Sequence, residues 1–324
     1  MASMQDIADV VGVSKTTVSL VLSGKAGTRV SDQVRERILN AAESMGYRVN
    51  DVARSLRTGR TNLIGVLVTE ISSEFFSKLS FCIQEEAKKH GYFVITANTN
   101  ESDEELTSML PVLIGKRVDG IIMVPTQHFQ GDSLNFSRYK VPVVLVDRYV
   151  EGMGTDYVGT DNYASARIAV NELVSAGKKR IGMFTLALDV NPINERKRGF
   201  RDSLETKGMF YPELVKTVDF EGRDDVHGLL EDMLSRNPDA IFFTSRRVFS
   251  MVMEHLSMED IRKNDLILLC FDEGKSYKGI LGDRLWYIRQ PIEDIACKSL
   301  DLLLDKIDGA RGQAKYEFVS TLVK

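Results

Sequence analysis

The basic residues of the chain are concentrated at its N-terminal end, where they are suited to bind phosphate groups. Residues 1–60 contain nine lysines and arginines against six acidic residues, whereas the remainder contains 33 against 40 and the whole chain has a net charge of −4. Lysine and arginine neutralise the phosphates of nucleic acids. A basic end on an acidic body therefore fits a DNA contact at one end of the chain only.

The residue types that could perform covalent or metal chemistry do not form recognisable sets. Four histidines and three cysteines are scattered along the chain: His90, His128, His227, His255, Cys82, Cys270 and Cys297. None of their spacings matches a zinc site or a disulfide framework, and three isolated cysteines are typical of reduced thiols in a cytoplasmic protein. The stretch GKAGTR lacks P-loop spacing, and we find no nucleophile–base set. The sequence therefore predicts no enzyme, no metal and no cofactor.

The basic end must be positioned by helices, because its first sixty residues contain no strand-like run. Ser3, Ser14 and Ser31 are suited to cap helices over 4–11, 15–22 and 32–45. Two short helices separated by a turn that contains Gly12 are typical of a helix-turn-helix, and the third helix completes a small bundle. A further short helix is expected over 51–57, and at that length it needs a partner to be stable.

From residue 63 onward, short apolar runs alternate with amphipathic stretches. The apolar runs cover 63–68, 92–97, 120–124, 141–146, 180–184, 240–244 and 266–271. The helical stretches cover 75–90, 103–115, 162–176, 195–207, 224–236 and 292–306. Such alternation predicts parallel sheets covered on both faces, and the length fits two α/β halves. No apolar run approaches the ~20 residues of a membrane helix, and we expect no secretory signal.

The chain resembles the lactose-repressor (LacI/GalR) family of bacterial regulators. The most specific segments are GVSKTTVSLVLSGK and RSLRTGRTNLIGVLV, and further family-like stretches are VDGIIMVP, PVVLVDR, VGTDNYASARIAV, ERKRGF, CFDE and RQPIEDIACKSLDLLL. The resemblance implies an α/β protein with an all-α helix-turn-helix headpiece and a two-lobed, doubly wound core like the periplasmic binding proteins. We expect the headpiece at 1–48, a hinge helix and linker at 49–61, and the core at 62–324. The lobes are expected at 62–161 plus 291–318 and at 162–290 plus 319–324.

The same resemblance implies residues that contact DNA. Lys15, Thr16 and Leu20 fall at base-reading positions of the second helix, and Leu20 departs from the usual polar choice there. Phosphate contacts are expected from Thr17, Lys25 and Ser31, while the loop 23–29 is longer than in many members and leaves the role of Arg29 open.

The hinge helix is expected to insert Leu56 into the minor groove, with Arg54 and Arg57 facing phosphates or the groove. Such a wedge unstacks a base step and kinks the duplex. The expected partner is therefore a pseudo-palindromic operator with a kink at its centre, bound by a homodimer.

The resemblance also implies a small-molecule site between the lobes, at the carboxyl ends of the strands. The expected effector-binding residues are Ser73, Phe75, Phe76, Thr126, Arg148, Arg196, Phe220, Ser245, Arg246, Asp272 and Gln290. Where relatives commonly carry Asn-Asp, this chain has Ser245 and Arg246, followed by Arg247. With Arg148 and Arg196 these residues suggest a cationic cleft, which favours a sugar phosphate or sugar acid over a neutral sugar. Alternatively, Arg246 and Arg247 face solvent or pair with acids, and Phe75 and Phe76 belong to the core.

The predicted function is that of a ligand-responsive, sequence-specific repressor of carbohydrate metabolism in the cytoplasm. Two alternatives are a regulator that responds to a purine or another non-sugar metabolite, and a cytoplasmic binding protein without enzymatic activity.

Overall fold

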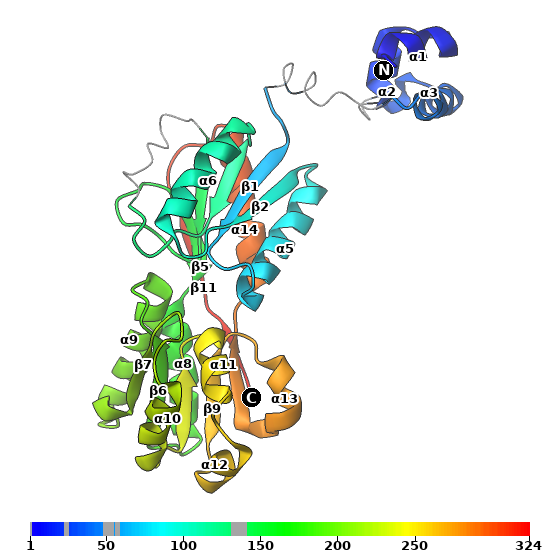
Figure 1. Ribbon diagram of the computed structural model, residues 1–324. Coiled ribbons are helices and arrows are strands. Elements are labelled where there is room, and N and C mark those ends of the chain that lie inside the picture. Colours follow the sequence, from blue (N-terminus) through cyan, green and yellow to red (C-terminus); the bar gives the residue numbers. More distant parts are fainter. Residues whose placement is uncertain (1, 23–25, 48–54, 56–58, 131–140) are drawn as a thin grey trace. The chain divides into compact units, whose positions relative to one another are not determined.

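The computed structural model describes residues 2–22, 26–47, 55, 59–130 and 141–324 (Figure 1). The chain forms two compact units, Met1–Thr61 and Asn62–Lys324. Four of the predicted DNA contacts, Lys25, Arg54, Leu56 and Arg57, lie outside the described residues, as does most of the predicted hinge helix.

The first unit contains the three predicted helices, α1 (Met4–Val11), α2 (Lys15–Leu22) and α3 (Asp32–Ser44). Ser3 and Asp6 form a capping box at the start of α1, and Gly12 ends that helix in the left-handed region at φ 74°. A 3-10 turn, η1 (Gly27–Arg29), precedes α3. The helices bury a shared apolar core that includes Ile7, Val18 and Ile38. The predicted bundle is therefore confirmed.

The second unit contains two lobes, and the N-terminal lobe is built on a six-stranded parallel sheet. Its order is β11-β5-β4-β3-β1-β2. The strands are β1 (Leu63–Val68), β2 (Phe93–Asn98), β3 (Gly120–Met123), β4 (Val143–Val146), β5 (Asp156–Thr160) and β11 (Lys315–Phe318). Helices α5 (Glu74–Lys89) and α14 (Ile292–Ile307) pack on one face, and α6 (Asp103–Gly115) packs on the other. Both faces are thus covered, as the apolar runs predict.

The C-terminal lobe repeats this arrangement with the strand order β12-β10-β9-β8-β6-β7, in which only β12 is antiparallel to its neighbour. The strands are β6 (Ile181–Leu186), β7 (Val215–Val218), β8 (Ala240–Phe243), β9 (Ile267–Phe271), β10 (Leu285–Arg289) and β12 (Thr321–Val323). One face is covered by α8 (Asn162–Ser175) and α9 (Asn191–Glu205). The other is covered by α10 (Val226–Ser235), α11 (Arg246–Met253), α12 (Met258–Lys263) and α13 (Lys275–Leu281), with 3-10 turns η3 (Pro212–Leu214) and η4 (Gly282–Arg284).

The chain passes between the lobes three times: after β5, after β10 and after β11. The third passage splits the segment KYEFVSTLVK into β11 of one lobe and β12 of the other (Figure 1). Helix α9 also begins at Asn191, four residues before its predicted start. Within the described part of the chain, no helix is long and apolar enough to span a membrane.

Candidate effector cleft and nucleic-acid interface

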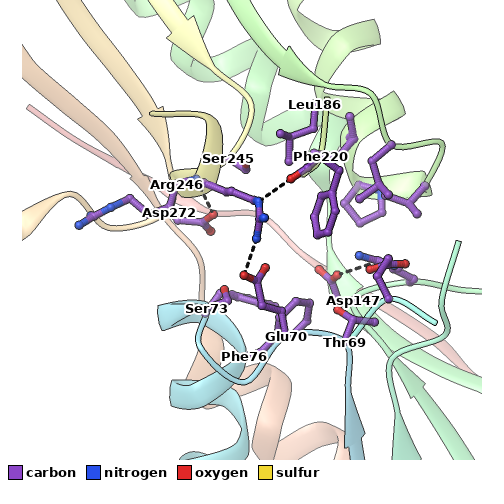
Figure 2. Close-up of a pocket in the computed structure, with 18 of the residues that line it drawn as sticks. Thr69, Glu70, Ser73, Phe76, Asp147, Leu186, Phe220, Ser245, Arg246 and Asp272 are labelled. Carbon is purple, nitrogen blue, oxygen red and sulfur yellow. Dashed lines mark hydrogen bonds and ion pairs between the residues drawn. The ribbon is translucent and has the colours of Figure 1, made fainter. Parts of the chain in front are cut away.

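A cavity of about 90 Å³ lies between the two lobes, at the carboxyl ends of their strands (Figure 2). Of the predicted effector-binding residues, those that line it are Ser73, Phe75, Phe76, Arg148, Arg196, Phe220, Ser245, Arg246, Asp272 and Gln290. Thr126 lies instead in a neighbouring cavity of about 240 Å³, which Arg148 also lines. The structure therefore brings together side chains from distant segments into one interlobe site.

Two aspartates occupy equivalent positions in the two lobes. Asp147 follows β4 and Asp272 follows β9, and both take a left-handed backbone, with φ of 64° and 81°. Each donates its backbone N–H across to the next strand, Asp147 to Val158 O and Asp272 to Ile288 O, at 3.1 Å in both cases. Left-handed non-glycine residues are uncommon and concentrate at functional sites.

The carboxyl group of Asp147 is almost fully buried. Burial raises the pKa of Asp147 to about 6, although the neighbouring guanidinium groups of Arg148 and Arg196 act in the opposite direction. A carboxyl with such a pKa donates a hydrogen bond when protonated and accepts hydrogen bonds when ionised, so both roles are accessible near neutral pH.

Arg196 on α9 is the most enclosed cation of the cleft. Its Nε donates to Asn162 Oδ1 at 2.8 Å and its Nη1 donates to Thr244 O at 2.8 Å. The guanidinium carbon lies 3.5 Å from the centroid of the Phe271 ring. Burial lowers the pKa of Arg196, while the carboxylates of Asp272 and Asp147 oppose that shift, and an arginine in these surroundings stays charged. These contacts fix the orientation of the planar guanidinium group in the cleft.

A relay of buried hydrogen bonds connects the cleft to two of the interlobe crossovers. The Gln290 side-chain amide donates to Asp272, and the Thr160 hydroxyl donates to Gln290 Oε1 at 2.6 Å. Thr160 ends β5 and Gln290 follows β10. The orientation of Asp272 is therefore tied to the segments that connect the two lobes.

The charge of the cleft differs from the sequence-based expectation. Besides its four arginines, the cavity is lined by four acidic residues: Glu70, Glu101, Asp147 and Asp272. Arg148 pairs with Glu101 at 2.6 Å, Arg247 pairs with Glu70, and Arg246 lies 3.8 Å from Glu74. The expectation of a cationic cleft is therefore wrong, and the alternative that Arg246 and Arg247 pair with acids is the one observed.

Glu70 and Glu101 also line the cleft, although the sequence did not identify them, and Arg247, which the sequence suggests beside Arg246, lines it as well. Glu70 comes just after β1 and Arg247 is the second residue of α11. Their positions at the carboxyl ends of parallel strands are the signal that could have identified them.

The apolar wall of the cleft consists largely of aromatic and aliphatic side chains. Phe75 and Phe76 contact each other edge to face with centroids 5.1 Å apart, and both belong to the apolar core beneath α5 as well as to the cavity lining. Phe220 faces them from the other lobe, beside Leu186 (Figure 2). An apolar wall with a few fixed polar groups is typical of small-molecule sites.

The predicted DNA contacts that the structure describes lie in the first unit. Lys15 and Thr16 are exposed in the first turn of α2, and Arg29 is exposed in η1. The hydroxyls of Thr17 and Ser14 are 2.8 Å apart, and the Ser31 hydroxyl accepts the backbone N–H of Val34 at 3.4 Å, so both Thr17 and Ser31 help to start their helices.

Leu20 is half-buried and packs against the core of the three-helix bundle. Its apolar side chain thus contributes to the headpiece core as well as to the surface of α2.

Both units match models of known protein families. Residues 3–50 match the model for bacterial regulatory proteins of the lacI family. Residues 61–280 match the model for periplasmic binding proteins and the sugar binding domain of the LacI family.

Full-length relatives are similar over nearly the whole chain. The ribose operon repressor of Halalkalibacterium halodurans is 32% identical, over 95% of this chain and 91% of that protein. The transcriptional regulator PtxS of Pseudomonas putida is 29% identical, over 99% and 94%.

Solved structures share the fold. The lac repressor dimer bound to operator and an anti-inducer superposes with a TM-score of 0.80 at 20% identity, covering 100% of this chain and 98% of that one. The regulator CelR in complex with cellobiose superposes with a TM-score of 0.70 at 23% identity, covering 100% and 99%.

Proposed function

The chain belongs to the LacI family of bacterial regulatory proteins, and we propose that it is a repressor whose operator affinity is set by a sugar bound between the two lobes. Members of this family are DNA-binding transcription regulators and not enzymes. The chain is therefore a DNA-binding regulator, and its mechanism is a coupling between two sites: the effector favours one lobe arrangement, and that arrangement changes the affinity for DNA.

A neutral, hydroxyl-rich effector fits the cleft best, and the observation that carries this proposal is the charge balance. Each hydroxyl of a sugar can accept from an arginine such as Arg196 and donate to a carboxylate such as Asp272. A phosphate or carboxylate would instead meet Glu70, Glu101 and Asp272, while three of the four arginines, Arg148, Arg246 and Arg247, already lie against acidic residues. The names of the relatives, which include ribose repressors and a cellobiose-bound regulator, support a sugar.

A thermal-shift and calorimetry series tests this effector class. D-ribose and cellobiose are compared with D-ribose 5-phosphate, D-gluconate and purines, because a ligand that binds the native state raises its melting temperature. We expect a neutral sugar to stabilise the wild type and to lose that effect with Asp272→Asn. Stabilisation by D-ribose 5-phosphate or a purine alone would contradict the proposal.

For the DNA site we propose that Lys15 and Thr16 read base edges in the major groove. Both are exposed in the first turn of α2, where recognition helices contact bases. Lys15→Ala should reduce specific affinity by about 1–3 kcal/mol and relax the preference at one base pair. Operator selection followed by binding titration measures both effects. Arg223→Ala removes an exposed charge of the second unit and serves as the control.

We propose a homodimer on a pseudo-palindromic operator, with Leu56 of both subunits inserted at a central kink and Lys25, Arg54 and Arg57 on phosphates. The lac repressor dimer on operator, whose fold this chain shares, supports that arrangement. Leu56→Ala should leave the dimer intact in light scattering and abolish most specific affinity. Retention of full operator affinity would exclude the wedge.

A further inference from the structure

An ion pair joins the two lobes directly across the interlobe cavity that both of its residues line. Glu70 follows β1 of the N-terminal lobe, and Arg247 lies in the first turn of α11 in the C-terminal lobe. Arg247 Nη1 lies 2.5 Å from Glu70 Oε1, and Figure 2 shows Glu70 opposite the segment that carries Ser245 and Arg246. This contact spans 177 residues of sequence.

The arginine of this pair is held in place by its own lobe. Arg247 Nε donates to the backbone carbonyl of Phe220 at 2.9 Å, and the guanidinium carbon lies 4.2 Å from the centroid of the Phe220 ring. The side chains of Arg247 and Glu70 are only 32% and 29% exposed, so water screens them less than a free surface pair. The C-terminal lobe therefore presents a preorganised cation to the other lobe.

A second, looser contact accompanies the first. Arg246 lies 3.8 Å from Glu74, at the start of α5 in the opposite lobe. Arg246 is itself held by Glu273 O at 2.6 Å and by the Ser276 hydroxyl at 2.7 Å. Two adjacent arginines of one lobe thus face two carboxylates of the other.

The space that remains beneath these contacts is small. The cavity holds about 90 Å³, whereas small-molecule sites usually measure roughly 300–1,000 Å³. A sugar therefore needs the lobes to separate before it can enter. Separation of the lobes must break the Glu70–Arg247 pair, because its two partners belong to different lobes.

We propose that the Glu70–Arg247 pair determines effector affinity by holding the two lobes in this closed arrangement, and that an effector binds only after the pair has opened. The pair and a residue that contacts the effector have opposite effects on effector affinity. Removal of a contact residue such as Asp272 weakens effector binding, whereas removal of either partner of the pair strengthens it. An ion pair of this exposure should change the dissociation constant by about two- to fivefold.

Interlobe distances in the ligand-free, full-length protein test this closure without any effector. Spin labels are placed at Lys116→Cys, after α6, and at Glu259→Cys, in α12. Both residues are exposed, and their segments lead into the N-terminal ends of β3 and β9, whereas the cleft lies at the carboxyl ends of the strands. Cys82→Ser and Cys297→Ser remove the accessible native thiols, while Cys270 is fully buried. Dilution with unlabelled protein suppresses distances between subunits.

We expect one short distance in the wild type and a second, longer distance in Glu70→Gln and in Arg247→Gln. The charge swap Glu70→Arg with Arg247→Glu should restore the short distance. Arg284→Gln is the matched control, because Arg284 is also 32% exposed and pairs with Asp265 within one lobe at 3.0 Å. Equal distance distributions in the wild type and both single variants would overturn the proposal.

The consequence for ligand binding rests on the proposed effector role of the cleft and is measured separately. Calorimetry with D-ribose should give tighter binding to Glu70→Gln than to the wild type, and wild-type affinity for the charge swap. If D-ribose binds none of these proteins, the choice of ribose as effector fails, whereas the spin-label distances still decide whether the pair closes the cleft.

Discussion

Asp147 shows how one buried carboxyl makes the stability of the core depend on pH. Its pKa is raised from 3.8 to about 6 in the folded protein, chiefly by burial. Between about pH 4 and pH 6 the folded state therefore holds a proton that the unfolded chain has released. The stability that the neutral carboxyl provides is complete below this window and is lost as the pH rises through it.

We predict that Asp147→Asn raises the free energy of unfolding at pH 8 by about 1–3 kcal/mol relative to the wild type. The amide has the same shape but no charge to desolvate. Urea unfolding from pH 4 to pH 8 should show the two proteins converging at the acidic end. Asp232→Asn is the control, because hydrogen bonds with Arg236 and Lys216 lower the pKa of Asp232 to about 2, so that this carboxyl is ionised across the whole range and the effect of its replacement should not change with pH. A difference in stability between Asp147→Asn and the wild type that does not change with pH would contradict the assignment.

Arg196 illustrates a different cost, that of removing a buried cation from its carboxylates. We predict that Arg196→Met lowers the free energy of unfolding by about 3–5 kcal/mol, because Asn162 and the Thr244 carbonyl lose their donor and Asp272 loses its nearby positive charge. Arg198→Met, two residues along the same helix, removes an arginine that is 50% exposed and pairs with Glu195. Its effect in the same urea titration should stay within about 1 kcal/mol.

At the level of elements, close packing of α8 and α9 depends on a residue without a side chain. A Cβ on Gly199 would lie 2.6 Å from the Tyr163 carbonyl oxygen and 3.0 Å from Ala166 Cβ. We predict that Gly199→Ala lowers the free energy of unfolding by about 1–3 kcal/mol, since one helix must shift away from the other.

Gly115, at the end of α6, is the matched control for that substitution. A Cβ there would meet no atom within 4 Å, so Gly115→Ala should be neutral or stabilising by up to about 1 kcal/mol. Equal melting temperatures for the two variants would show that α8 and α9 accommodate the added methyl group without a loss of stability.

The periodicity of the sequence predicts most of these elements because their apolar runs and caps are local signals. The bounds of α1, α2, α6 and β1 agree with the structure. Helices α11 to α13 were not predicted, since each is short and packs beside longer elements. Helix α9 begins early because Pro192 is favourable in a first turn, although it is a helix breaker elsewhere.

The cleft could be predicted only in part, because its ion pairs join residues that are far apart in the sequence. Family likeness identifies positions such as Arg196 and Asp272 that line it. It does not tell which acid faces which arginine, because the pairing of Glu70 with Arg247 depends on the relative placement of two lobes. The charge of the site therefore emerged only from the three-dimensional arrangement.

At the scale of the whole core, Thr160 and Gln290 connect the crossovers to the effector site. We predict that Thr160→Val, which leaves Gln290 Oε1 buried without its donor, lowers the free energy of unfolding by about 1–3 kcal/mol. It should also weaken binding of the proposed effector, with D-ribose as the probe, because Gln290 no longer fixes Asp272.

Thr185→Val is the control that distinguishes a loss of stability from a loss of effector affinity. It removes a buried hydrogen bond with Thr244, 3.1 Å long, inside one lobe. Urea unfolding should show a similar loss of stability, whereas calorimetry should show an unchanged dissociation constant for D-ribose. A parallel loss of affinity in both variants would mean that Thr160 acts through stability alone.

The passage of the chain from β11 to β12 also has a consequence for biosynthesis. The N-terminal lobe lacks α14 and β11, and the C-terminal lobe lacks β12, until residues 292–323 have been synthesised. The three-helix unit, by contrast, is complete within its first 44 residues. Because domains fold in order as they leave the ribosome, the DNA-reading unit can form on the nascent chain long before either lobe. Each newly made molecule thus acquires its headpiece before it acquires the sensor that controls it.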